Sequence, residues 1–139
     1  MILLDTSVWV EYLRATGSSA AVGVRELLGR DPDIVAICEP VAMELLAGAA
    51  DDQRHARLER LVNGLPVLAT DTHVDFRQAA DLYRAGRKSG RTVRSLVDCL
   101  IASIAIRHDV ELWHRDADFD VIASLASLRT RSFVSEGGR

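Results

Sequence analysis

Short apolar runs alternate along the chain with longer segments in which apolar residues recur every three or four positions. The short runs are typical of β-strands and occupy residues 2–4, 34–37, 67–68, 110–113 and 129–133. The longer segments are typical of amphipathic helices and occupy residues 6–14, 20–29, 40–47, 52–63, 72–88, 95–107 and 117–125. This alternation predicts an α/β sandwich, in which helices cover both faces of a parallel sheet of four or five strands.

The 139 residues are enough for one domain, spanning positions 1–139, and only residues 136–139 resemble a frayed tail. Asp5 arrives too early for a secretory signal, and the longest nearly apolar run, residues 99–106, is too short to cross a membrane. With two cysteines in all, we expect a cytoplasmic protein with reduced thiols. The net charge of −3 argues against wrapping duplex nucleic acid, but allows a nucleic-acid enzyme with an acidic site.

Most acidic residues fall where solvated helix faces or caps are expected, and these include Asp51, Asp52, Glu59, Asp71, Asp75 and Asp81. Asp75 also completes a Thr72-x-x-Asp75 pattern, which predicts a capping box at the start of helix 72–88. Two other acids are less easily explained. Asp5 directly follows a predicted strand, although it could simply cap the next helix. Glu44 lies within an apolar helix, although it could reach water from the helix edge.

Asp98 is the clearest exception. It is the only charged residue in positions 95–106, a helix that is apolar on all sides and is therefore predicted to be buried. A buried carboxylate is costly without a partner, so Asp98 needs a cation or hydrogen-bond donors. A local alternative exists, because Ser95-x-x-Asp98 is also a capping pattern for this helix. The two roles are compatible.

Three carboxylates occupy alternate positions after the predicted strand 110–113, namely Asp116, Asp118 and Asp120. They do not form an EF-hand calcium loop, because Val121 and Ser127 stand where that loop needs glycine and glutamate. An aspartate-rich helix start is the simpler alternative. His114, just before this segment, is expected to be a loop residue rather than a metal ligand.

The four acids that stand out lie at strand ends or in the early turns of helices, and they are Asp5, Glu44, Asp98 and Asp116. If they converge at the carboxyl edge of the sheet, each pair of charges about 5 Å apart repels by about 3 kcal/mol at an effective dielectric of about 20. Mg²⁺ or Mn²⁺, which prefer oxygen ligands, would relieve this repulsion and create a site that activates a phosphodiester. Among the histidines and cysteines, no spacing suggests zinc.

These residues carry a resemblance to a known family. The opening MILLDTSVWVEYL resembles the start of PIN-domain ribonucleases, in which an apolar run precedes Asp and then Thr or Ser. The resemblance continues in order with Glu44 in a mid-chain helix, the SLVD segment ending at Asp98, and the RDADF segment starting at Arg115. It covers essentially the whole chain and is greatest with the VapC toxins of bacterial type II toxin–antitoxin systems.

The resemblance implies a PIN-like three-layer sandwich and an endoribonuclease that depends on Mg²⁺ or Mn²⁺ and cleaves structured RNA such as tRNA or rRNA. It also implies a cognate VapB-like antitoxin, a homodimer and a toxin–antitoxin hetero-oligomer, with no membrane association. The catalytic residues would be Asp5, Glu44, Asp98 and Asp116. The metal ligands would be Asp5, Asp98, Asp116 and Asp118, with either Asp116 or Asp118 in the fourth acidic position. Thr6 and Ser95 would support these side chains, Thr6 by orienting the region of Asp5.

Binding of RNA requires positive charge, and the densest basic stretch, residues 84–94, leads into the helix of Asp98. The residues expected to hold RNA phosphates are Arg87, Arg91, Arg94 and Arg115. A solvated helix end, with cations near its C-terminus, would give the same pattern.

Two other functions are compatible with the sequence: a metal-dependent DNA nuclease, and a non-catalytic module that binds through its acidic pocket. The apolar residues of the first two helices have two possible roles as well. They are either core or the seat of an antitoxin helix, and they comprise Trp9, Tyr12, Leu13, Val24, Leu27 and Leu28.

Overall fold

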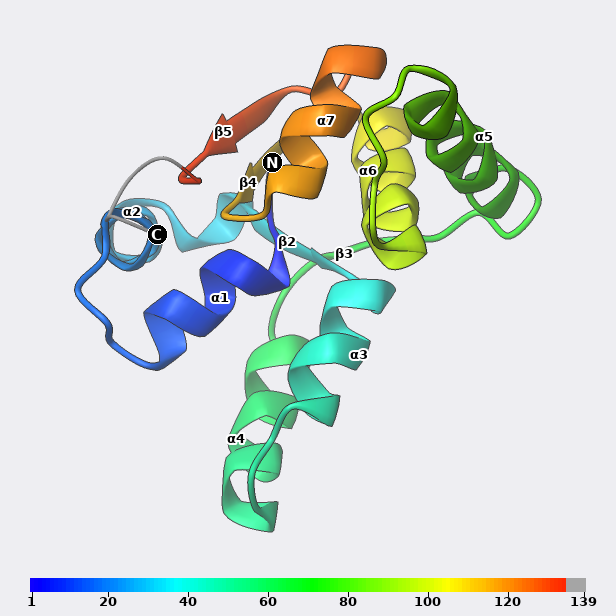
Figure 1. Cartoon of the computed structure of the whole chain (residues 1–139). Helices are drawn as coiled ribbons and strands as arrows, with labels where there is room; N and C mark the ends of the chain where they lie inside the picture. The colour runs from blue at the N-terminus through cyan, green and yellow to red at the C-terminus, as the bar shows by residue number, and fades with distance from the viewer. Residues whose placement is uncertain (135–139) are drawn as a thin grey trace.

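The computed structural model describes residues 1–134, in which helices flank a five-stranded sheet (Figure 1). The predicted tail, residues 136–139, lies outside the described residues. The strands are β1 (Ile2–Leu4), β2 (Val35–Cys38), β3 (Val67–Leu68), β4 (Glu111–His114) and β5 (Thr130–Ser132). The helices are α1 (Thr6–Leu13), α2 (Ser19–Arg30), α3 (Glu39–Ala47), α4 (Asp52–Asn63), α5 (Asp75–Lys88), α6 (Leu96–His108) and α7 (Ala117–Leu125), with a 3₁₀ turn at Pro32–Ile34.

All neighbouring strands pair in parallel, in the order β3–β2–β1–β4–β5. Leu3 in the central strand lies opposite Ala36 of β2 and Leu112 of β4. The predicted α/β class and the parallel sheet are therefore confirmed. Because the strands are parallel, the chain leaves β1, β2 and β4 at the same edge of the sheet, and this edge positions the acidic residues.

The core lies on both faces of the central strands. In Figure 1, α1 and α2 lie on one side of the sheet, and α5, α6 and α7 lie on the other. Trp9, Val24 and Leu27 are fully buried core residues, whereas Leu13 is 44% exposed. Within residues 1–134, no helix is long and apolar enough to span a membrane.

The connection from α5 to α6 depends on a close approach of the backbone. An ideal Cβ on Gly86 would lie 2.9 Å from the carbonyl oxygen of Arg91, which is closer than real Cβ contacts. Glycine at position 86 therefore lets the chain fold back against α5 immediately after the helix ends. This return directs the segment that follows towards the start of α6.

The predicted capping box at the start of helix 72–88 is wrong. The helix begins at Asp75, and Val74 precedes it without a side-chain cap. The carboxylate of Asp75 accepts a hydrogen bond from the N–H of Asp71, at 2.8 Å, rather than from residue 72. The turn before α5 is thus closed by a different bond from the one that the pattern predicts.

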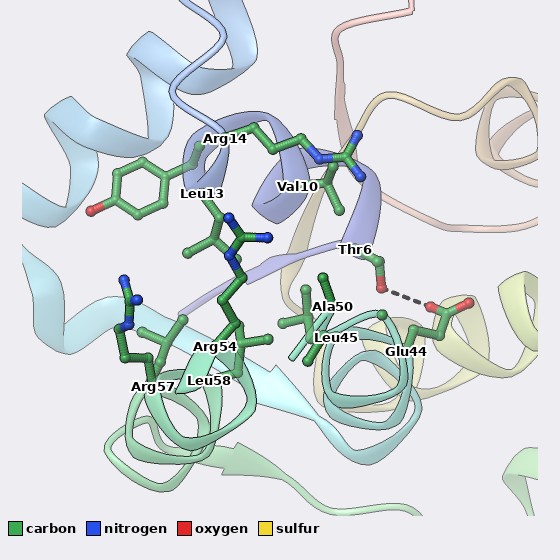
Figure 2. A pocket seen from close by; sticks show the side chains of 14 residues that line it. Thr6, Val10, Leu13, Arg14, Glu44, Leu45, Ala50, Arg54, Arg57 and Leu58 are labelled. Atoms are coloured by element: carbon green, nitrogen blue, oxygen red, sulfur yellow. Dashed lines mark hydrogen bonds between the residues drawn. The ribbon is translucent and has the colours of Figure 1, made fainter. Parts of the chain in front are cut away.

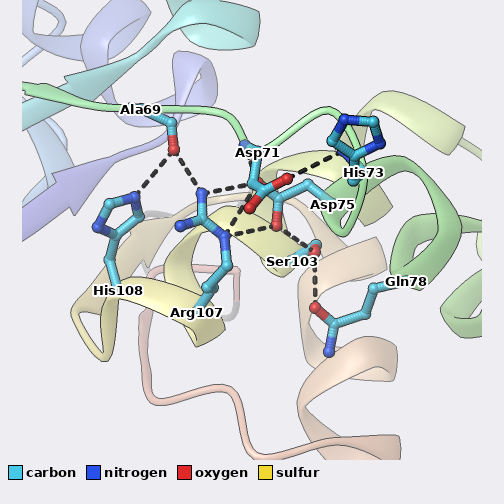
Figure 3. A network of polar contacts seen from close by, with 8 residues as sticks. All are labelled: Ala69, Asp71, His73, Asp75, Gln78, Ser103, Arg107 and His108. Atoms are coloured by element: carbon cyan, nitrogen blue, oxygen red, sulfur yellow. Dashed lines mark hydrogen bonds and ion pairs between the residues drawn. The ribbon is translucent and has the colours of Figure 1, made fainter.

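Asp75 is also fully buried, so its predicted place among the solvated acids is wrong. Figure 3 shows the network that compensates its charge. Arg107 near the end of α6 pairs with Asp75 at 2.8 Å, and the hydroxyl of Ser103 donates to Asp75 at 2.9 Å. Burial alone would raise the pKa of Asp75, but the bonds from Arg107, Asp71 and Ser103 hold this pKa below its ordinary value. The network fastens the start of α5 to the end of α6.

Candidate metal centre

Asp5 directly follows the central strand, β1, and caps α1. The backbone N–H and the hydroxyl of Ser7 both donate to its Oδ2, at 3.0 and 2.5 Å. The other oxygen, Oδ1, is buried and has no hydrogen-bond partner among residues 1–134. Burial, aided by the charges of Glu44 and Asp116, raises the pKa of Asp5 to about 6 despite the lowering effect of the bonds from Ser7.

Glu44 lies on α3, where it is half-buried. The hydroxyl of Thr6 donates to its Oε1 at 2.7 Å, which joins the start of α1 to α3. Thr6 was expected to orient the region of Asp5, but the side chain that it contacts is Glu44. The charge of Glu44 contributes to the raised pKa of Asp5, so the two carboxylates are close enough to interact.

The start of α6 forms half of the predicted capping box. The Oγ of Ser95 accepts a hydrogen bond from the N–H of Asp98 at 3.2 Å. The reciprocal bond is taken over by Asp118, whose Oδ2 accepts from the N–H of Ser95 at 3.1 Å. The carboxylate of Asp98 is therefore not used in capping, and its buried Oδ2 has no partner among the described residues. Burial, the contact with Asp116 and the surrounding negative charge raise the pKa of Asp98 to about 9.

Asp116 and Asp118 have different partners. Asp116 caps α7 by accepting the N–H of Asp118 at 2.9 Å. Asp118 accepts the backbone N–H groups of Arg94 and Ser95, and the Nε of Arg94 lies 3.6 Å from its second oxygen. Asp118 thus connects α7 to the start of α6.

His114 was expected in a loop, but it is the last residue of β4 and is fully buried. Its Nδ1 accepts a hydrogen bond from the N–H of Asp116 at 3.2 Å, and its ring packs on Phe119. Burial lowers the pKa of His114 and so favours the neutral ring. His114 therefore holds the backbone of Asp116 in place.

The acidic groups converge at the carboxyl edge of the sheet. One carboxylate oxygen from each of Asp98, Asp116 and Asp118 lies within 4.8 Å of the other two. Asp5 and Glu44 are outside this group of three, but Asp5 interacts electrostatically with Asp98 and Asp116. Several oxygen ligands, two of them buried and without partners, fit a hard divalent cation such as Mg²⁺ or Mn²⁺.

Comparison with known proteins agrees with this geometry. Residues 2–125 match the PIN domain family. The chain belongs to the PIN-domain family. Ribonuclease VapC11 of Mycobacterium tuberculosis is 62% identical over 133 residues, which cover 96% of this chain and 99% of the relative. Ribonuclease VapC32 of the same organism is 36% identical over 118 residues, covering 84% of this chain and 85% of the relative.

Solved structures show the same PIN fold. VapBC-1 from nontypeable Haemophilus influenzae superposes with a TM-score of 0.74 at 17% identity, covering 97% of this chain and all of the other, 100%. Mycobacterium tuberculosis VapC20, described as a sarcin-ricin loop cleaving toxin, gives a TM-score of 0.65 at 21% identity, covering 93% and 99% of the two chains. At these identities the likeness concerns the fold alone.

The arginines expected to hold RNA differ in their surroundings in this PIN domain. Arg87 lies over the ring of Tyr83, and Arg91 donates to Ser124 on α7 at 2.9 Å. Arg94 is 79% exposed beside Asp118. Arg115 points towards α1 instead, where it pairs with Glu11. Arg94 is therefore next to the acidic cluster. Arg87 belongs to the last turn of α5, Arg91 contacts the last turn of α7, and Arg115 is turned towards α1.

A groove opens beside the cluster between α1 and the α3–α4 pair of the PIN domain (Figure 2). Its volume is about 680 Å³, and Thr6 and Glu44 line the end nearest the acids. Arg14 and Arg54 extend into this space, above an apolar wall to which Leu45 and Leu58 contribute. None of the α4 residues is buried, and Leu58 and Leu61 of this helix line the groove.

Sequence reasoning missed two side chains that organise the site, Ser7 and His114. Ser7 could have been suspected from the DTS segment, because a hydroxyl two residues after an aspartate often closes a turn with it. His114 gave a weaker signal, namely a polar residue directly after a buried strand. Both side chains contact an aspartate two residues away, and only the bond from the N–H of Arg115 to the Oγ of Ser7 joins segments that are distant in the sequence.

Proposed function

We propose that this PIN domain is a metal-dependent endoribonuclease toxin that cleaves structured RNA, such as tRNA or rRNA, and is neutralised by a VapB-like antitoxin. The main support is the 62% identity to a ribonuclease over nearly the whole chain. The partnerless buried oxygens of Asp5 and Asp98 add physical support, because such atoms are costly unless a cation or donor meets them. The same chemistry favours an enzyme over a non-catalytic acidic pocket.

The proposed roles follow from the contacts of each side chain. The catalytic group comprises Asp5, Glu44, Asp98 and Asp116. The cation would be held by Asp5, Asp98 and Asp116, with Asp118 as a further ligand through the oxygen that accepts no backbone N–H. Thr6 orients Glu44, and Ser95 fixes the first turn that carries Asp98.

A bound Mg²⁺ or Mn²⁺ would supply a Lewis acid for the phosphodiester and would lower the pKa of a water molecule. The protein holds its ligands on rigid elements, since Asp5 and Asp116 are each fixed by capping bonds. We assign to Glu44, which Thr6 holds at one end of the groove, the role of accepting a proton from the attacking water. Arg94, next to the cluster, and Arg87 and Arg91, which precede it in the chain, are proposed to hold phosphates of the RNA.

The antitoxin proposal has independent support from the fold neighbours. Several of the matching structures are VapBC toxin–antitoxin complexes, including the one from Haemophilus influenzae. Of the apolar side chains that were either core or partner surface, Leu13 and Tyr12 line the groove beside the acidic cluster. This groove is the surface where we place the antitoxin, and occupying it would cover Glu44.

The test is cleavage of structured RNA by purified, antitoxin-free protein with Mg²⁺, with Mn²⁺ and with EDTA, beside a DNA of the same sequence. We expect cleavage of RNA only with a metal, and a loss of at least about a hundredfold in Asp98→Asn, because a lost metal ligand removes several kcal/mol of transition-state stabilisation. Asparagine is nearly isosteric, so the fold should persist. Cleavage of DNA alone, or equal cleavage by the folded variant, would contradict the proposal.

A further inference from the structure

Arg115 directly precedes Asp116, but its side chain leaves the acidic cluster. Its Nη1 lies 2.6 Å from the Oε1 of Glu11 on α1, and the two side chains are only 19% and 18% exposed. The hydroxyl of Thr16 donates to the same Oε1 at 2.7 Å, which fixes the carboxylate from the other side. The guanidinium is therefore neutralised by Glu11 in a place that is partly shielded from solvent.

The same face of α1 also binds the backbone of Arg115. Ser7 lies one helical turn before Glu11, and its Oγ accepts the N–H of Arg115 at 2.9 Å. Through its hydrogen, that hydroxyl donates to the Oδ2 of Asp5 at 2.5 Å. One helix face thus holds Asp5 directly and holds the residue next to Asp116 at two points.

We propose that Ser7, Glu11 and Arg115 are positioning residues, which fix Asp5 and Asp116 relative to each other so that both can ligate one divalent cation. The inference rests on the proposed function in one respect, namely that these two aspartates hold the metal. It replaces the expected role of Arg115 as an RNA contact. If Arg115 turned to a phosphate, Glu11 would lose its cation while remaining largely enclosed, which is unfavourable.

The test is a titration of metal-free protein with Mn²⁺, in which electron paramagnetic resonance measures the free ion. This readout does not depend on enzymatic activity. Partners that orient metal ligands typically change metal affinity by about 10- to 100-fold. We expect Glu11→Gln and Arg115→Gln each to weaken Mn²⁺ binding about tenfold. The double variant should be no weaker than either single variant, since one interaction is lost in all three. Ser7→Ala should weaken it at least as much, and Arg129→Gln, which breaks the exposed pair with Asp109, should leave it unchanged.

A charge swap makes the test sharper. Glu11→Arg combined with Arg115→Glu restores an ion pair between α1 and the β4–α7 connection, so we expect Mn²⁺ affinity to recover to within about threefold of the parent. Thermal unfolding of each variant shows whether it is folded at the temperature of the titration. If folded Glu11→Gln and Arg115→Gln bind Mn²⁺ like the parent, the proposal is overturned.

The RNA-contact alternative predicts a different readout. Binding of an RNA hairpin in EDTA is measured at several salt concentrations, and a lost phosphate contact flattens the slope by about 0.7 to 0.9. We expect the slope of Arg115→Gln to equal that of the parent, and a flatter slope with parental Mn²⁺ affinity would overturn the proposal. Should the protein cleave no RNA at all, the ribonuclease proposal fails, while the Mn²⁺ titration still decides the role of these three residues.

Discussion

The two ends of α6 face buried carboxylates that the protein treats in opposite ways. At its C-terminal end, Arg107 and Ser103 satisfy Asp75, and the pKa of Asp75 is held below its ordinary value. At its N-terminal end, Asp98 has a buried oxygen without a partner among the described residues, and its pKa is raised to about 9. Burial is therefore not what separates the two sites. The difference is whether the chain itself supplies the compensating charge.

This difference shows how structural and functional carboxylates can be distinguished. A carboxylate that serves the fold is met by donors from the same chain, and it lowers the free energy of the folded state. One that is left unsatisfied beside others of its kind raises that free energy, and such a cost persists where it serves a function. In this domain the cost is located where three strands end, which is where a parallel sheet presents its site.

The largest expected effect on stability is at Asp75. We expect Asp75→Asn to lower the free energy of unfolding by about 3 kcal/mol, because it removes one partner of a buried ion pair and weakens a network that joins α5 to α6. Urea unfolding in EDTA measures this change. The Mn²⁺ affinity of the variant should equal that of the parent below the unfolding transition, since the network is at the far end of α6.

Two variants serve as controls for this comparison. Asp109→Asn breaks the exposed pair with Arg129 and should change stability by less than about 0.5 kcal/mol. Asp98→Asn should instead raise the stability of the metal-free protein, because it removes a carboxyl group that the fold forces to take up a proton or to bear a buried charge without a partner. If Asp98→Asn and Asp75→Asn destabilise the metal-free protein equally, the distinction between the two ends of α6 is wrong.

A smaller effect is expected when pH is varied. The folded-state pKa of Asp5 is about 6 and that of Asp98 is about 9, both above the ordinary value of 3.8, so the folded state binds these protons more tightly than the unfolded state. Their contribution to stability is complete below about pH 4 and is lost as pH rises through about 6 and then about 9. The contribution of Asp75 to stability has the opposite dependence on pH. Because its folded-state pKa is lowered, this contribution is present above the ordinary value of 3.8 and is lost as pH falls through the folded-state pKa.

Metal-free protein should therefore lose stability steadily between pH 5 and pH 8, because Asp98 and, up to about pH 6, Asp5 hold protons in the folded state that the unfolded state has released. The measurement is urea unfolding across this range, in EDTA and again with saturating Mn²⁺. The cation should abolish most of the loss, because it neutralises the carboxylates that are otherwise forced to ionise together. A profile that is flat in EDTA would show that Asp5 and Asp98 ionise without penalty.

The sequence was sufficient for the fold wherever the pattern was local. Strand and helix positions followed from apolar periodicity, and β1 and α7 were predicted with their observed bounds. The start of α5 was not, because the Thr72-x-x-Asp75 pattern is a local signal and the actual partner of Asp75 is Arg107, 32 residues away. Long-range charge pairing of this kind leaves no trace in the spacing of residues.

The candidate site was predictable to a similar limit. An acid within an apolar helix, such as Asp98, can be recognised as a candidate site residue from the sequence. The same is true of an acid directly after a strand, such as Asp5. The pattern could not show which hydrogen-bond partners each of the neighbouring acids has. Asp116 and Asp118 look alike in the sequence, and only the fold shows that Asp118 accepts two backbone N–H groups from the start of α6. The orientation of the Arg115 side chain was also not predictable, because it depends on a contact with Glu11 of α1.

The smallest expected effect separates a cap that serves the site from one that serves only a helix. Ser95→Ala removes the acceptor for the N–H of Asp98, and Ser18→Ala removes the matching acceptor at the start of α2. Each should cost about 1 kcal/mol of stability in urea unfolding. Only Ser95→Ala should also weaken Mn²⁺ binding, by less than tenfold, because Asp118 still holds the N–H of Ser95. Equal Mn²⁺ affinity in both variants would mean that Asp98 is positioned by the packing of α6 rather than by its cap.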